Sequence, residues 1–269
     1  MSTRTRAGVV AAGILVHAAL ASGTLSALPV EVRIALAFLT LVMLPGYAFV
    51  ALGARPPGGA WLAPGWALGF GVAWLGLLVL ATRALGVPFT TLAWWALPAD
   101  ALLWGVALRW GVRSRATEAA PAATAGANAP DRSQASGWTP LPLAVLLLAA
   151  VVGAWMAGRL GAPLGITTDS PDHIGTIRRM LTSGDAFPRD AFFRDAGAEG
   201  TDPRKGLWHP EVALVAKLAA ADPLTTWRFL PACLVPLFVL IVAQMGFLLR
   251  GPPGAAVAGW AWLLTYGGS

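Results

Sequence analysis

Apolar runs of about the length needed to cross a bilayer constrain the fold of this chain more than any other feature. They cover residues 8–28, 34–52, 64–85, 90–110, 141–160 and 223–249, and a shorter run begins at Gly254. A helix needs about 20 consecutive apolar residues to cross the hydrocarbon core. Only 12% of the residues are charged, whereas roughly a quarter are charged in a typical soluble domain. The sequence therefore predicts an all-α, polytopic transmembrane protein.

The first and fourth runs each raise a question about their polar residues. Arg4 and Arg6 precede the first run, as in a signal peptide, but further spans follow at once, so we expect a retained span. His17 inside that run is expected to bond to a neighbouring helix, and Asp100 inside the fourth run needs a partner or a wet cavity. If these two residues carried protons, the protein would instead be an ion transporter.

A polar segment divides the chain into two modules. Residues 112–140 are rich in Ala, Pro, Gly and Ser and show no apolar periodicity, which predicts a flexible linker. Residues 1–111 then form a module of about four spans. Residues 141–269 form a second module of one span, a polar loop over 161–222, another span and an incomplete span. Because the last apolar run is short, we expect the chain to be an N-terminal fragment.

Arginine placement predicts which side of the membrane the polar loop faces. Positive residues gather in cytoplasmic loops. With a cytoplasmic N-terminus, the inner loops and helix ends hold Arg4, Arg6, Arg55, Arg109, Arg113, Arg115, Arg132 and Arg250. The short outer connections hold only Arg33 and Arg83, with Arg159 at the outer end of the fifth span. The loop over 161–222 is therefore expected outside the cytoplasm, in a multi-pass protein of a cell membrane, such as a bacterial plasma membrane.

Composition also excludes several function classes. The net charge is +6, but no Lys/Arg run with interleaved aromatic residues appears, so a nucleic-acid partner is not expected. Membrane lipids and phosphate-bearing lipid substrates suit that charge better. Cys233 is the only cysteine, which rules out an intramolecular disulfide. The sequence lacks CxxC, HExxH, Walker and GxGxxG patterns, so no cofactor is indicated.

The polar stretch from Thr167 to Pro210 is where chemistry is expected. Its first half, Asp169-Ser170-Pro171-Asp172-His173, has the capping residue, proline and acid that begin a helix. Ile174, Ile177 and Leu181 then form an apolar stripe that ends at Gly184. Asp172, Thr176 and Arg179 follow one another on a different face. This pattern predicts a short amphipathic helix lying at the membrane surface.

The second half of the polar stretch adds basic and aromatic residues. Lys205-Gly206-Leu207-Trp208-His209-Pro210 precedes a second short helix, expected over residues 210–221, with Leu214, Val215 and Leu218 on one face. Trp227 and Arg228 then stand where the sixth span begins.

This order of motifs resembles the GT-C class of membrane glycosyltransferases, especially the protein mannosyltransferase and lipid A aminoarabinose transferase branch. The similar positions are Pro171-Asp172, the helix from Arg178 to Leu181, Gly184-Asp185, Lys205 to Pro210, and Trp227 to Pro231. The resemblance covers about Leu141 to Leu249. It departs from the family at three points. The adjacent acidic pair has a single member, His209 interrupts the proline pair, and four extra spans come first.

The resemblance implies sugar transfer from a polyprenyl-phosphate-type lipid donor to an unidentified acceptor. Asp172 would be the general base, with Asp169 as the second candidate. A carboxylate there would take the proton of the acceptor hydroxyl, and cations would stabilise the leaving phosphate. The substrate-binding candidates are His173, Arg178, Arg179, Lys205, His209 and Arg228.

Two alternatives remain open at this stage. A divalent metal could bind Asp169, Asp172 and His173, although adjacent residues at a helix start point apart. The protein could also be non-catalytic, serving envelope polysaccharide assembly or lipid transport, with a polar loop that is only structural.

Overall fold

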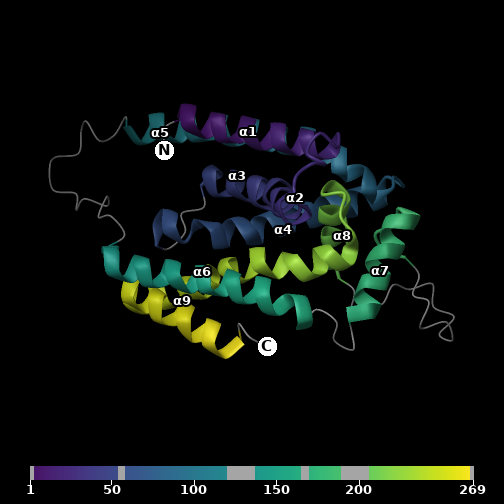
Figure 1. Cartoon of the computed structure of the whole chain (residues 1–269). Helices are drawn as coiled ribbons and strands as arrows, with labels where there is room; N and C mark the ends of the chain where they lie inside the picture. The colour runs from purple at the N-terminus through teal and green to yellow at the C-terminus, as the bar shows by residue number, and fades with distance from the viewer. Residues whose placement is uncertain (1–2, 54–57, 120–136, 165–169, 189–205, 267–269) are drawn as a thin grey trace.

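The computed structural model describes residues 3–53, 58–119, 137–164, 170–188 and 206–266. In this part of the chain the regular structure is entirely helical, and Figure 1 shows the long helices packed side by side. The α-helices are α1 Thr3–Ala21, α2 Val30–Phe38, α3 Leu44–Leu52, α4 Ala63–Ala84, α5 Leu92–Ala119, α6 Pro140–Leu164, α7 Ser170–Ser183, α8 Trp208–Leu218 and α9 Pro223–Tyr266. Short helical segments of other types are η1 Leu39–Met43, η2 Gly59–Trp61 and η3 Phe89–Thr91.

Helices long and apolar enough to cross a membrane make up most of the described chain. There are five such segments within it: Val30–Leu52, Ala63–Ala84, Phe89–Trp110, Pro140–Arg159 and Pro223–Thr265. Many of their large apolar side chains, including Leu102, Leu148 and Leu249, remain exposed in the isolated chain, as expected for surfaces that face lipid. The all-α polytopic fold predicted from the sequence is confirmed, and the protein is membrane-embedded.

Two predicted boundaries are wrong. The first span was expected over residues 8–28, but α1 ends at Ala21 because the chain turns at Gly23, which has a φ of +76°. The apolar part of α1 is then shorter than the five spanning segments. The linker was expected from residue 112, but α5 continues as a helix to Ala119. Alanine, arginine and glutamate, which favour helix, are common in that extension.

The second span bends where the sequence places a proline. Residues 39–43 form a π-helical segment immediately before Pro45, because proline lacks an N–H and disturbs the regular hydrogen-bond ladder. Glycines let the bent helix approach α4 closely. A Cβ on Gly46 would collide with the Ala67 carbonyl, and one on Gly71 would collide with the Val42 carbonyl.

The last helix is a hairpin. The backbone leaves helical geometry at Arg250 and Gly251, and the segment beyond folds back on the first half of α9. Gly246 and Gly254 face each other so closely that a Cβ on either would strike the other's carbonyl. This break lies between Leu249, where the sixth span was expected to end, and Gly254, where another apolar run was expected to begin.

Connections of the helices gather at two opposite ends of the bundle. At one end, Arg33 of α2 donates hydrogen bonds to the carbonyls of Ala219 and Ala220 after α8, at 2.6 and 3.2 Å. At the other end, the Trp138 indole donates to the Gly58 carbonyl at 3.0 Å and stacks on Phe247. Both α7 and α8 belong to the first end, where they lie across the long helices (Figure 1).

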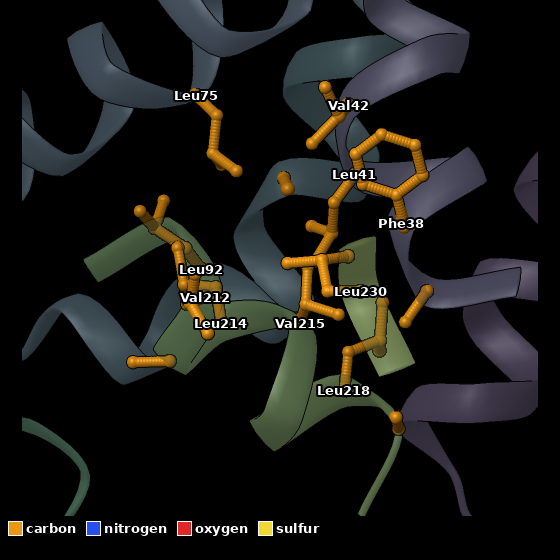
Figure 2. Close-up of a cluster of buried hydrophobic side chains, with 14 of the residues drawn as sticks. Phe38, Leu41, Val42, Leu75, Leu92, Val212, Leu214, Val215, Leu218 and Leu230 are labelled. Atoms are coloured by element: carbon orange, nitrogen blue, oxygen red, sulfur yellow. The ribbon is translucent and has the colours of Figure 1, made fainter. Parts of the chain in front are cut away.

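The cluster of buried apolar residues around α8 includes residues from both predicted modules. Figure 2 shows Val212, Leu214, Val215 and Leu218 of α8 meeting Phe38 of α2, Leu41 and Val42 of η1, Leu75 of α4, Leu92 of α5 and Leu230 of α9. Helix α8 therefore packs inside the bundle formed by the N-terminal helices, although more than a hundred residues separate them in the sequence.

The two polar residues that the sequence analysis singled out within apolar runs both have hydrogen-bond partners. His17 contacts the Ala93 carbonyl, and Asp100 accepts a hydrogen bond from the Trp74 indole, both at 2.8 Å.

Candidate functional site

Helix α7 begins as the sequence predicts. It starts at Ser170 and carries Asp172 in its first turn, where the helix dipole favours a negative charge. It ends at Ser183, and Gly184 follows with a φ of +72°, a conformation that glycine adopts without strain. Asp172 is therefore fixed at one end of a regular helix whose boundaries come from its own sequence.

The apolar stripe of α7 faces protein. Ile174, Ile177 and Met180 are all buried, and Ile177 is 0% exposed. Ile177, Met180 and Leu181 belong to the same core cluster as α8. The stripe predicted from Ile174, Ile177 and Leu181 is confirmed, but it packs against the buried helix α8 instead of lipid. This packing fixes which face of α7 is turned outward.

The outward face of α7 carries one acidic and one basic side chain. Asp172 and Thr176 are half-buried and Arg179 is exposed. These positions are four and seven residues apart and so lie along one side of a helix. A carboxylate and a guanidinium are thus presented on the same surface, two helical turns apart.

Two histidines join α7 to α8 beside that surface. Nδ1 of His173 and Nε2 of His209 are 2.8 Å apart, which is a hydrogen-bond distance. The His173 ring also stacks on Trp227 of α9, with centroids 5.3 Å apart and an angle of 16° between the planes. His209 is buried, at 4% exposure. Residues from three separate motifs, namely the acidic turn, the basic-proline motif and the start of the sixth span, therefore meet in one cluster.

Arg178 forms an ion pair with an acid that stands just before α9. Its guanidinium pairs with the carboxylate of Asp222 at 3.1 Å, and both side chains are about half exposed. Asp222 also accepts a hydrogen bond from the Leu224 backbone N–H at 2.8 Å, so it caps α9. Arg178 thus ties α7 to the start of α9.

Three predicted site residues remain, of which the structure describes only Arg228. Arg228 is half-buried, follows Trp227, and has an Nε atom that is buried without a hydrogen-bond partner among the described residues. Asp169 and Lys205 lie outside the described residues. In the part of the chain that the structure describes, no group of three His, Cys, Asp or Glu side chains is arranged to hold a metal ion.

One charged residue at this end escaped the sequence analysis. Glu211 of α8 is 2% exposed, and neither carboxylate oxygen has a hydrogen-bond partner among the described residues. Its side chain faces Gly76 of α4. Burial raises the pKa of Glu211 to about 8, because a low-dielectric surrounding disfavours the charged form. The available signal was an acid next to the apolar run from Val212 to Ala216.

Comparisons with protein-family models, with curated proteins and with solved structures found no match. The functional argument therefore depends on the residues and on their arrangement.

Proposed function

We propose that the protein is a membrane glycosyltransferase that moves a sugar from a polyprenyl-phosphate-type lipid donor to an acceptor on the extracytoplasmic side. The observation that carries this proposal is the meeting of His173, His209 and Trp227, with Asp172 one residue before His173 in the first turn of α7. The motifs that resemble the GT-C class are separated in the sequence, and a shared reaction centre would explain why their residues lie close together in the fold.

In the proposed reaction, the Asp172 carboxylate takes the proton of the acceptor hydroxyl as that oxygen attacks the anomeric carbon. The new bond joins the acceptor oxygen to the sugar, and the bond from the anomeric carbon to the donor phosphate oxygen breaks. A base within hydrogen-bond reach of the attacking hydroxyl assists this step. Asp172 is half-buried and outward-facing, which leaves it able to meet an acceptor.

The leaving lipid phosphate gains negative charge as the bond breaks, and nearby cations stabilise it. Arg179 shares the outward face of α7 with Asp172, and Arg228 follows Trp227, the α9 member of the histidine cluster. His173 and His209 would orient that cluster and could donate a proton or hydrogen bond to the phosphate. Arg178 contributes less, because its ion pair with Asp222 already engages its charge. Asp169 remains the second candidate base and Lys205 a further phosphate candidate.

The membrane orientation belongs to the same proposal. The end that holds α7 and α8 also holds the turn between α4 and α5, since the Phe89 backbone N–H donates to the Gly184 carbonyl. The opposite end holds the start of α1, the later part of α5 and the turn within α9 (Figure 1), and these segments carry Arg6, Arg109 and Arg250, respectively. A positive-inside arrangement puts the opposite end in the cytoplasm, so the site faces outward.

The test is sugar transfer by purified protein in lipid vesicles supplied with a polyprenyl-phosphate sugar. Asp172→Asn should lower the rate by about 10²- to 10⁴-fold, the range typical of losing a general base. Glu31→Gln is the matched control, since Glu31 is an exposed acid at the same end. Equal rates for Asp172→Asn and the wild type would reject Asp172 as the base. A wild type with no transfer from any lipid-linked sugar would favour a non-catalytic role in envelope polysaccharide assembly or lipid transport.

A further inference from the structure

A cavity lies at the same end of the bundle, at the far end of α7 from Asp172. It has a volume of about 260 Å³ and is formed where the turn after α4 meets the turn after α7. Its lining includes Arg83, Val87, Phe89, Ser183 and Asp185. Because α7 is a straight helix between the two places, this cavity is separate from the cluster at His173.

The walls of the cavity are held by specific contacts. The Phe89 backbone N–H donates to the Gly184 carbonyl at 3.0 Å. The Arg83 guanidinium lies over the Phe187 ring, 4.8 Å from its centroid, a favourable cation–π arrangement. A Cβ added at Gly184 would come within 3.0 Å of Pro88. These contacts pack the turn after α4 tightly against the turn after α7.

The cavity offers one positive and one negative side chain that do not neutralise each other. In the described part of the chain Arg83 and Asp185 form no ion pair, and the pair at this end joins Arg178 to Asp222 instead. One Asp185 oxygen accepts a hydrogen bond from the Phe187 N–H at 2.8 Å. Arg83 and Asp185 are both exposed, so a ligand with opposite charges at its two ends could reach both of them.

The rim of the cavity is apolar and continues onto a transmembrane helix. Leu85 and Val87, beside the cavity, are 76% and 40% exposed. Leu77 and Leu80 are exposed on α4 and lead toward the cavity along the helix. A free sugar is a poor fit, because Phe89 is 1% exposed and the Phe187 ring is covered by Arg83. Among the described residues that line the cavity, Phe89 is the aromatic one, and its burial leaves it unable to stack on a sugar ring.

We propose that this cavity binds a zwitterionic, amine-bearing phospholipid of the surrounding membrane. The headgroup phosphate bonds to Arg83 and its ammonium bonds to Asp185, with charge-assisted hydrogen bonds at both ends. The acyl chains run along Leu80 and Leu77 of α4. The proposal does not depend on the transfer reaction, so a failure of sugar transfer leaves it standing.

The experiment is native mass spectrometry of the detergent-purified protein titrated with phosphatidylethanolamine, phosphatidylcholine or phosphatidylglycerol. The wild type should retain phosphatidylethanolamine most strongly, because its ammonium can donate hydrogen bonds to Asp185 and its phosphate can accept from Arg83. Arg83→Gln should weaken binding of all three lipids by roughly tenfold. Asp185→Asn should reduce phosphatidylethanolamine to the level of phosphatidylcholine, while keeping an oxygen for the Phe187 N–H.

Phe187→Leu is the matched control, since it removes the ring under Arg83 and leaves both charges in place. It should keep the preference for phosphatidylethanolamine, and thermal unfolding in detergent should show that all variants are folded. Should phosphatidylglycerol bind the wild type as tightly as phosphatidylethanolamine, or should Arg83→Gln and Asp185→Asn both bind lipid normally, the proposal is wrong. Displacement of bound lipid by a soluble oligosaccharide would also overturn it, by assigning the cavity to sugars.

Discussion

The short helices α7 and α8 come from the same loop, residues 161–222, but are buried to very different degrees. Helix α7 buries only its apolar stripe and keeps Asp172 and Arg179 on an outward face. Helix α8 is buried along almost its whole length, with Lys217 as the exposed side chain. The difference indicates that α8 anchors this end of the bundle to the N-terminal helices, whereas α7 carries the side chains that we propose to be reactive. The hydrogen bond between His173 and His209 joins α7 to α8.

The largest predicted stability effect tests the anchoring role of α8. Leu214 is 0% exposed in the core of Figure 2, so Leu214→Ala should lower the free energy of unfolding by about 2–5 kcal/mol. Leu181→Ala on α7 should cost clearly less, because Leu181 is only partly buried. Unfolding in mixed detergent micelles measures both. Equal losses for the two variants would contradict the comparison.

The next effect concerns the buried acid of α8. Burial raises the pKa of Glu211 from 4.5 to about 8. Between about pH 4.5 and pH 8, the folded protein therefore keeps a proton on Glu211 that the unfolded chain has released. The free energy of unfolding should therefore fall as the pH rises from about 5 to about 8, and level off above that. Glu211→Gln cannot ionise, so it should match the wild type at the acidic end and exceed its stability by on the order of a few kcal/mol at the alkaline end.

Stability measured across that pH range decides whether Glu211 behaves in this way. Glu31→Gln, which changes an exposed acid of α2, should leave the pH dependence of the wild type intact. A Glu211→Gln variant with the same pH dependence as the wild type would show that Glu211 is not the group responsible.

The smallest effect lies on the exposed side of α7. Arg178 and Asp222 are about half exposed, and exposed ion pairs contribute about 0.2–1 kcal/mol. Arg178→Ala should therefore change the free energy of unfolding by less than about 1 kcal/mol, and added salt should reduce the difference. A loss as large as that of Leu214→Ala would mean that Arg178, too, is part of the anchor.

Local features of this fold were predictable because short stretches of sequence determine them. Apolar runs predicted the spans, and the pattern from Ser170 to Gly184 predicted α7 and its buried stripe. The change of helix geometry before Pro45 is equally local, because proline removes a backbone donor from the helix.

Long-range features were not predictable in this way. The burial of α8 depends on contacts with helices that precede it by more than a hundred residues. Glu211 and the Arg178–Asp222 pair depend on the same packing. The sequence could nominate His173 and His209 as site residues, but it could not show that their rings are hydrogen-bonded to each other.

The most direct test of the account is a double-mutant cycle on that histidine pair. Sugar transfer from a lipid-linked donor should be measured for His173→Asn, His209→Asn and the double variant, with thermal unfolding as the control for folding. The account predicts that each single variant loses activity and that the double variant loses little more than the worse single one, because both break the same contact. Full activity in both single variants, or losses that simply add, would contradict the claim that α7, α8 and α9 build one site.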